Sequence, residues 1–406
     1  MALTGRADGP PLAAPGDPAG AVRRSLAAFA AAAGVGPRAL PGIGLLGERA
    51  AVAGFGRRAP LSAGGAFRFV SCADGSIGVS LARATDHELV PALVGESDPG
   101  EPWAALTSWA AGERAVEAVA RAQLLGIPAA VVPEIPGKVS DEQATYRALP
   151  TASTEGGVRR TGERPVVVDL SALWAGPLCA HLLGLAGARV VKVESPERPD
   201  GARSGPGAFY DLLHAGHESV CLDLASPRGR DTLWRLVQKA DVVLESSRPR
   251  ALHRLGVVAE EAVAQGTVWT SITAYGRTGP WSERVGFGDD VAAAAGLVVR
   301  DPVSGALAPC GDALADPLTG VAAAAATAAA LRAGRGRLVD VAMREVVLAA
   351  AAAPGPGPHT TCRLPDGSWQ VETEHGRHPV RAPRARAPRG RARGLGADNG
   401  AWLGAR

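Results

Sequence analysis

The chain has 406 residues, of which 46% are hydrophobic and 20% are charged. This composition supports two or three domains with buried cores and excludes a wholly disordered chain. Lysine and arginine outnumber aspartate and glutamate by 43 to 40, so we expect binding to neither nucleic acid nor an anionic membrane. The five cysteines show no CxxC spacing, which predicts neither a zinc site nor a disulfide framework and favours the cytoplasm.

Pro- and Gly-rich segments divide the chain. The first segment lacks the basic and apolar regions of a signal peptide, and its composition predicts disorder. In the last segment, arginines alternate with Pro, Ala and Gly, which predicts an extended or disordered tail. No run reaches the ~18 to 20 apolar residues of a membrane span. The predicted divisions are a disordered N-terminus at 1–20, a small α+β domain at 21–140, a linker at 141–163, a larger domain at 164–353, and a Pro/Gly linker with a basic tail at 354–406.

The predicted small domain begins with a hairpin. Two β-rich runs, Phe67–Val70 and Ile77–Leu81, flank an Asp-Gly turn, which is typical of a hairpin. Helical spacing follows at Asp86–Leu93 and Trp103–Leu125, and a short strand is predicted at Ala129–Val132.

The larger domain alternates short β-rich runs with helices that open on a proline. This order predicts an α/β fold, a Rossmann-like doubly wound parallel sheet accompanied by the smaller α+β domain. The turn after the first strand lacks the GxGxxG spacing, so a nicotinamide or flavin cofactor is not supported. The predicted strands are 166–170, 189–193, 219–224, 241–244 and 268–272, and the predicted helices are 177–186, 227–239 and 249–255.

Asp316 is the leading candidate for a catalytic residue. It precedes a segment, Gly320–Arg335, in which thirteen of sixteen residues are Gly, Ala, Val or Leu, so a close-packed helix is predicted. Asp followed by Pro317 also suits a helix N-cap. The two roles are compatible because N–H groups at a helix start orient a carboxylate and keep it ionised.

Several segments, taken together and in order, resemble the family III CoA-transferases, a group related to the α-methylacyl-CoA racemases. The resemblance covers residues 164–350, and Leu395–Leu403 resembles the family's C-terminal segment. The segments are Val168–Ser171 with Ala175–Pro177, Gly187–Glu194, Ser219–Leu224, Ala240–Glu245, Arg248 to Gly256, Tyr275 to Pro280, Ala315 to Gly320, and Gly334 to Met343.

The domain order departs from the family's pattern. In the family, a small domain follows the helix expected at Val339–Met343, but here a linker stands in that place. Residues 67–132 resemble the missing domain, so the arrangement resembles a circular permutation. The family's interlocked dimers imply a homodimer.

The resemblance implies covalent catalysis at Asp316. Its carboxylate would attack the carbonyl of an acyl-CoA, and the thiolate would return to give an enzyme-bound CoA thioester. A carboxylic acid acceptor would then take up the CoA. Coenzyme A is thus implied as a thioester substrate, with no tightly bound cofactor, and the sequence identifies neither acid.

The same resemblance implies a set of CoA contacts. Trp174 and Ala175 would lie near the thioester, and Leu222, Asp223, Leu224 and Ala225 would line the adenine with Ser246 and Ser247. Arg248 and Arg254 would meet the phosphates, although an arginine at a helix end is also typical of a solvated side chain. In formyl-CoA transferases a glutamine stands at Trp174 and an arginine at Ser195. The tryptophan favours a bulkier or more apolar acyl group, and Arg198 or Arg203 could replace the missing arginine.

Two alternatives stay open at this point. A racemase or epimerase would need a histidine where Phe287 stands, or a substitute at Asp289 or Asp290, which are also typical helix caps. A catalytically silent CoA-binding protein would keep affinity for the nucleotide but would not depend on Asp316. Glu283, Asp289 and Asp290 could assist the acceptor, whereas the histidines show no metal-binding spacing.

Overall fold

The computed structural model describes residues 1–134, 151–158 and 164–403. Its central element is a seven-stranded sheet in which one edge strand runs antiparallel to its neighbour and all other pairs are parallel. In spatial order the strands are β4 (Thr151–Val158), β12 (Arg335–Ala342), β9 (Val268–Thr273), β8 (Val242–Glu245), β5 (Val166–Asp169), β6 (Arg189–Glu194) and β7 (Glu218–Cys221).

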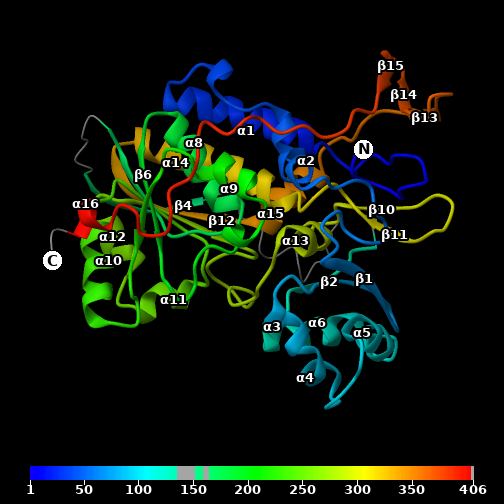
Figure 1. The fold of residues 1–406 in the computed structure, drawn as a ribbon, viewed down its shortest axis with the longest axis horizontal. Coiled ribbons are helices and arrows are strands. Elements are labelled where there is room, and N and C mark those ends of the chain that lie inside the picture. Colours follow the sequence, from blue (N-terminus) through cyan, green and yellow to red (C-terminus); the bar gives the residue numbers. More distant parts are fainter. Residues whose placement is uncertain (135–150, 159–163, 404–406) are drawn as a thin grey trace.

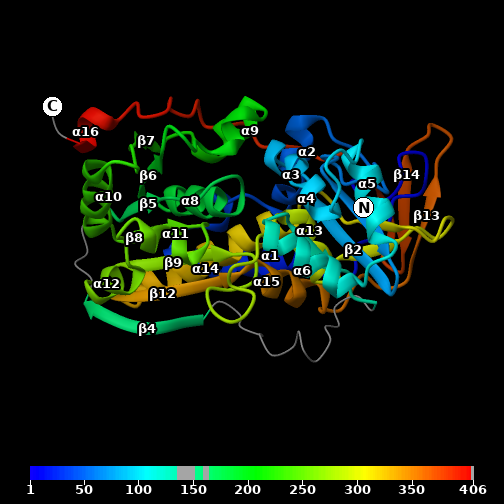
Figure 2. The ribbon, with the colours of Figure 1, turned by 90° about the horizontal axis from the view of Figure 1, so that it is seen from below.

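The chain reverses its direction of travel across the sheet at β5. Strands β6 and β7 follow on one side of it, and β8, β9 and β12 follow on the other (Figure 2). This is the strand order of a doubly wound Rossmann-like sheet, so the predicted α/β class is confirmed. Ligands bind such sheets beyond the carboxyl ends of the strands at this reversal point.

Two strands of this sheet were not predicted. Strand β4 lies in the segment expected to be a linker, 141–163. Strand β12 occupies most of a segment expected to be helical, and the helix begins only at Met343. Parallel pairing of Val339 with Thr270 places this strand beside β9, where Val339 and Val341 are buried.

Helices cover both faces of the sheet (Figure 1). Neighbouring valines point to opposite faces: Val167 belongs to one hydrophobic cluster and Val168 to the other. The first cluster packs against α1 (Pro18–Ala33), α8 (Ala175–Leu185), α14 (Ala315–Arg332) and α15 (Met343–Ala351), and the second against α10 (Pro227–Lys239), α11 (Pro249–Arg254) and α12 (Ala259–Ala264).

The first twenty residues are ordered against the larger domain, which corrects the expectation of disorder. Leu3 and Thr4 are buried, and the Thr4 hydroxyl accepts the N–H of Gly311 at 3.0 Å. Helix α1 begins at Pro18 and lies along α14 (Figure 1). Residues 18–53, with the short helices η1 (Pro37–Ala39), η2 (Ile43–Gly47) and α2 (Glu48–Ala53), therefore pack with the larger domain.

The small α+β unit has its own hydrophobic cluster. The predicted hairpin is present, with Val70 opposite Ile77. The helix expected over Trp103–Leu125 is two helices, because Asp74 accepts the N–H of Ala115 at 2.7 Å and fixes a second helix start. The elements are β1 (Phe67–Cys72), β2 (Gly75–Ser80), α3 (Ala84–Glu88), α4 (Val90–Val94), α5 (Pro102–Ala110), α6 (Ala115–Leu125) and β3 (Ala129–Val131).

The C-terminal segment is partly folded and otherwise extended over the surface. Residues 359–379 form a three-stranded antiparallel sheet of β13 (His359–Arg363), β14 (Trp369–Thr373) and β15 (Gly376–Pro379). The chain then runs along the larger domain to α16 (Asn399–Leu403) (Figure 1). Ion pairs hold this extended run, including Arg386 with Glu48, and Asp398 accepts the N–H of Ser219 at 2.8 Å.

Helix length and hydropathy bear on membrane insertion. In the ranges given above, no single helix is long and apolar enough to cross a membrane, and the segments Pro18–Ala33 and Pro37–Ala53 pass that test only as a pair bent by 112°.

Candidate active site

A cavity of about 320 Å³ lies at the reversal point of the sheet. The turn after β5, the residues after β8 and the end of β9 form one side, and Asp316 with Met343 contributes another. The segment that leads into α13 (Gly288–Ala294) and Arg83 from the small unit complete the lining. A larger cavity of about 1040 Å³ lies elsewhere, between the N-terminal segment and the 354–384 region, and Asp316 does not line it.

Asp316 lies in the first turn of α14, after Ala315, rather than at the N-cap. Its own N–H donates to the carbonyl of Ala313 at 2.9 Å. The carboxylate instead receives a hydrogen bond from the backbone of Ala175, the first residue of α8. The helix start that orients this carboxylate is therefore that of α8, not that of its own helix.

The Asp316 carboxylate lies close to the backbone of Gly288. A Cβ atom at Gly288 would come within 2.2 Å of Asp316 Oδ2 and 2.6 Å of the Ala313 carbonyl oxygen. Any larger residue would displace the carboxylate, so this glycine is required by close approach.

One arginine faces three carboxyl groups at this point. Arg49 of α2 forms a bidentate ion pair with the buried Asp312, with Nε to Oδ2 at 2.9 Å. Burial raises the pKa of Asp316 to about 7; the charge of Arg49 opposes this shift, while Asp289 and Asp312 add to it. Near neutral pH the carboxyl group is therefore partly protonated, and it gains nucleophilicity as it ionises.

Two other acids, both in the first turn of α13, have structural partners. Asp289 Oδ1 accepts the N–H of Ala313 at 2.9 Å, and burial raises its pKa to about 6. Asp290 is the third residue of α13 rather than its N-cap; it accepts the N–H of the N-cap residue Phe287 at 3.0 Å and the hydroxyl of Ser80 at 2.7 Å. Glu283 pairs with Arg250 at 2.9 Å and lies outside the Asp316 cavity.

A buried lysine network holds the turn after β5. Lys192 is 1% exposed and pairs with Asp200 at 2.9 Å, and Asp169 lies 3.6 Å away. Burial alone lowers the pKa of Lys192, but the two carboxylates reverse this shift and raise it. Asp200 Oδ1 also accepts the N–H of Leu173 at 2.9 Å. The network thereby fixes Leu173, which lines the cavity.

Among the residues that the structure describes, two that are not glycine adopt positive φ angles, and both flank the site. Leu173 has a φ of 70° and Ala313 a φ of 46°. Side chains with a Cβ atom rarely adopt this conformation, and such strain concentrates at functional sites. Here the hydrogen bonds to Asp200 and Asp289 hold the two residues in place.

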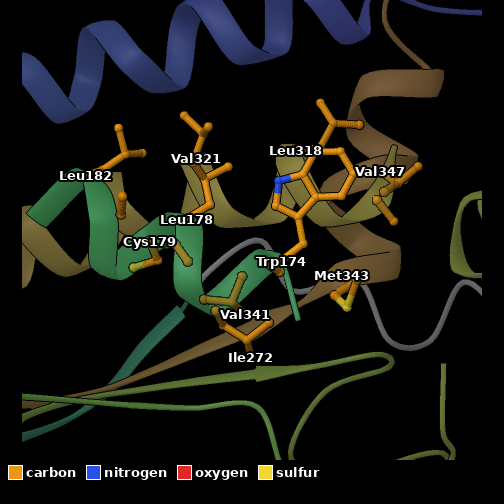
Figure 3. Packing of buried hydrophobic residues seen from close by; sticks show 14 of the residues in the cluster. Trp174, Leu178, Cys179, Leu182, Ile272, Leu318, Val321, Val341, Met343 and Val347 are labelled. Atoms are coloured by element: carbon orange, nitrogen blue, oxygen red, sulfur yellow. The ribbon is translucent and has the colours of Figure 1, made fainter. Parts of the chain in front are cut away.

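Trp174 lies in the hydrophobic core rather than in the cavity. Its indole is 4% exposed, packs edge-on against Phe209 with ring centroids 5.3 Å apart, and lies 5.3 Å from the Arg49 guanidinium. Figure 3 shows it beside Leu318 in the packing between α8 and α14. The indole thus supports Arg49 and does not line the cavity near Asp316.

The structure brings some of the expected CoA contacts together. Ala175, Ser246, Ser247 and Arg248 line the cavity with Asp316. The other expected contacts do not line this cavity. Arg254 lies exposed in the last turn of α11, and the four residues that follow β7 are Leu222, Asp223, Leu224 and Ala225.

Arginines give the cavity a positive character. Arg83, Arg198, Arg248 and Arg284 all line it. Of the two substitutes considered for the arginine missing at Ser195, Arg198 lines the cavity, whereas Arg203 forms an ion pair with Glu194 at 2.6 Å. Guanidinium groups suit the phosphates of a nucleotide.

Sequence reasoning missed several residues of the site. Arg49 carried no signal because its partner, Asp312, is 263 positions away. Lys192 did carry one: a lysine inside the apolar run Arg189–Val193 needs buried counter-ions. Gly288 also gave no local sign, since its role depends on contact with Asp316.

The residues that line the cavity do not favour a racemase. Phe287, at the position where a histidine would be needed, lines it, and no histidine is among the lining residues within the described ranges. Across residues 1–134, 151–158 and 164–403, no group of three His, Cys, Asp or Glu side chains is placed to hold a metal ion.

Known proteins resemble part of this chain in sequence. A succinyl-CoA–D-citramalate CoA-transferase of Chloroflexus aurantiacus is 33% identical over 198 residues, which cover 45% of this chain and 49% of the relative. A succinate–glutarate CoA-transferase of Agrobacterium fabrum is 32% identical over 200 residues, covering 44% and 50%. The chain thus spans about half the length of these curated relatives.

A solved structure of a CAIB/BAIF family protein from Brucella suis is 28% identical, with a TM-score of 0.46, covering 52% of this chain and 65% of that one. The model of the family described as CoA-transferase family III matches residues 164–377, which is more than half of the chain. The chain therefore belongs to CoA-transferase family III.

Proposed function

We propose that this protein transfers CoA from an acyl-CoA thioester to a carboxylic acid, with Asp316 as the covalent nucleophile. The observation that carries the proposal is the placement of the Asp316 carboxylate in an arginine-lined cavity at the reversal point of the sheet. Family membership and relatives named as CoA-transferases support it.

The proposed reaction has four balanced steps. An Asp316 oxygen attacks the acyl carbonyl, and the CoA thiolate leaves. The thiolate attacks the Asp316 carbonyl of the resulting anhydride, which releases the donor acid and leaves CoA bound to Asp316 as a thioester. The acceptor carboxylate attacks that thioester and expels the thiolate. The thiolate then attacks the acceptor carbonyl, which gives the new acyl-CoA and restores the carboxylate.

The structure provides three features that suit this chemistry. The Ala175 N–H orients the nucleophile, and Arg49 favours its ionised form. The buried network of Lys192 holds the turn at Leu173, so the cavity wall is rigid where the thioester would lie. Arg198 and Arg248 flank the end where the nucleotide phosphates would bind.

We test the role of Asp316 by substitution. Asp316→Asn keeps the shape of the side chain but removes the nucleophilic carboxylate, so CoA exchange between labelled acids should fall by about 10³-fold or more. The measurement is mass spectrometry of CoA thioesters after incubation with acyl-CoAs and isotope-labelled acids in heavy water.

Asp231→Asn, on the exposed face of α10, is the matched control and should exchange CoA at the wild-type rate. Full exchange by the Asp316 variant would refute the mechanism. Deuterium at the α-carbon without exchange of the acid would identify an epimerase, and CoA binding without either reaction would identify a silent binding protein.

A further inference from the structure

Arg284 differs from the other arginines that line the cavity near the nucleophile. Arg83 is paired with the buried Asp86, and Arg198 and Arg248 are exposed. Arg284 is partly buried, and no acidic side chain in the described parts of the chain forms an ion pair with it. Its guanidinium instead stacks on Trp281 at 4.3 Å from the ring centroid. A partly buried cation without a counter-ion is costly unless a ligand supplies one.

Two more hydrogen-bond donors without partners lie beside Arg284. The Arg344 guanidinium is 5.4 Å from the centroid of the same Trp281 ring, and the Tyr275 ring packs edge-on against it at 5.7 Å. Tyr275 is 8% exposed and Arg344 is 2% exposed. The Tyr275 hydroxyl and Arg344 Nη2 are both buried and find no hydrogen-bond partner within the described ranges. Arg344 Nη1 donates to Glu345 at 2.7 Å, so the atoms without an acceptor are its Nη2 and the Tyr275 hydroxyl.

Arg284 belongs to the chain segment that leads to Asp316's neighbour Gly288. Arg284 lies four residues before Gly288, whose backbone contacts the Asp316 carboxylate. Arg198 and Arg248 instead lie after β6 and β8, with Ser246 and Ser247. The cavity is thus lined both by exposed arginines suited to phosphates and by a partly buried arginine on the segment that leads to Gly288.

We propose that Arg284, supported by Tyr275 and Arg344, binds the second carboxylate of a dicarboxylic acid while its first carboxylate exchanges CoA at Asp316. This inference rests on the proposed function and adds the class of acid. A carboxylate accepts two hydrogen bonds from one guanidinium, and it would supply the missing acceptor. Of these three residues only Arg284 lines the cavity, and a monocarboxylic acid of the same length would leave its guanidinium without a counter-ion.

The test compares acids that differ only in the second carboxylate. Exchange of label between succinyl-CoA and succinate is measured against exchange between butyryl-CoA and butyrate, and glutarate is likewise compared with valerate. Wild type should favour the diacid pairs by about 10- to 100-fold in kcat/KM. Arg284→Gln should lose that preference, mainly through a higher KM for the diacid, and should slow the diacid pairs more than the monoacid pairs, while Arg284→Lys should keep part of the preference.

The control is Arg250→Gln, because Arg250 is exposed, pairs with Glu283 and lies outside this cavity. An equal loss for diacids and monoacids in Arg284→Gln would overturn the proposal. Weaker binding of free CoA to that variant, with the diacid preference intact, would also overturn it and assign Arg284 to a phosphate.

Calorimetry with succinate and butyrate separates this inference from the proposed function. Binding of succinate that depends on Arg284, in a protein that exchanges no CoA, would support the carboxylate site and contradict the transferase. Equal binding of the two acids to wild type would contradict the carboxylate site alone.

Discussion

Asp316 lies where opposing electrostatic effects meet. Burial and the charges of Asp289 and Asp312 favour the neutral acid, whereas Arg49 and the start of α8 favour the carboxylate. The balance places the pKa at about 7. A nucleophile with this pKa is partly ionised at neutral pH and keeps more nucleophilic strength than a carboxylate with an ordinary pKa.

This balance predicts the pH dependence of the reaction. Because Asp316 must be ionised to attack, kcat/KM should rise with pH and level off above a midpoint near 7. Asp289→Asn removes a negative neighbour that raises this pKa, so the midpoint should move to lower pH. The asparagine can still accept the Ala313 N–H. Rate profiles between pH 5 and 9 check this, with Asp231→Asn as the unshifted control.

A midpoint near 4 in wild type, or no shift in Asp289→Asn, would contradict this account of the Asp316 environment.

The same raised pKa of Asp316 also affects the stability of the fold. A carboxyl group whose pKa is higher in the folded chain destabilises the fold as pH rises from its unfolded value towards the folded one. Folding should therefore lose part of its free energy between pH 4 and 7 through this group.

At the residue scale, sequence reasoning could find Asp316 because the motif around it resembles a known family. Sequence reasoning could not find the groups that shift the pKa of Asp316. Arg49 and Asp312 are brought together only by the packing of α2 against the larger domain. It also placed Trp174 near the thioester, whereas the fold buries that indole among apolar residues.

At the scale of elements, the site depends on close packing between α8 and α14. Gly320 permits this approach: a Cβ there would lie 2.6 Å from the Ala175 carbonyl oxygen and 3.0 Å from Leu178 Cβ. Both helices consist almost wholly of small and aliphatic residues, so their backbones come near each other. The hydrogen bond from Ala175 to Asp316 requires that short separation.

Gly320→Ala should therefore destabilise the protein and slow the reaction. The added methyl group meets a backbone oxygen that cannot rotate away, which should cost about 1 to 3 kcal/mol of unfolding free energy despite the better helix propensity of alanine. Urea unfolding and kcat measure the two effects. Gly207→Ala, at the start of α9 (Gly207–His214), meets no atom within 4 Å and should be neutral. Wild-type stability of the Gly320 variant would contradict this packing argument.

The elements with the clearest patterns were predictable. Apolar runs of four to six residues between proline-led helices gave β5, β6, β7, β8 and β9, and α10 has the predicted bounds. Strand β12 was not predictable, because Arg335, Arg337 and Asp340 interrupt its apolar pattern. As the last parallel strand before the antiparallel β4, it carries more polar side chains than the central strands.

At the scale of the whole molecule, the small unit closes one side of the site. Ser80 donates to Asp290, and the Gln123 side chain hydrogen bonds both to the N–H and to the carbonyl of Val285. Arg83 lines the cavity beside Phe287. The circular permutation, the homodimer and the cytoplasmic location inferred from the sequence stay predictions.

The order of the terminal segments was the least predictable feature. The first twenty residues and the basic tail have compositions typical of disorder, yet both lie against the larger domain. Their hydrogen bonds and ion pairs join residues hundreds of positions apart, such as Arg386 with Glu48. No local pattern contains that information.

The most direct test of covalent catalysis follows oxygen from the acceptor acid to Asp316. In the proposed steps, the thiolate takes the acceptor acyl group from Asp316, so one acceptor oxygen stays on the enzyme carboxylate. After turnover with an acceptor labelled with oxygen-18 in both positions, peptide mass spectrometry should find the label in the peptide that contains Asp316. Transfer of CoA without label in that peptide would contradict the acyl-aspartyl mechanism.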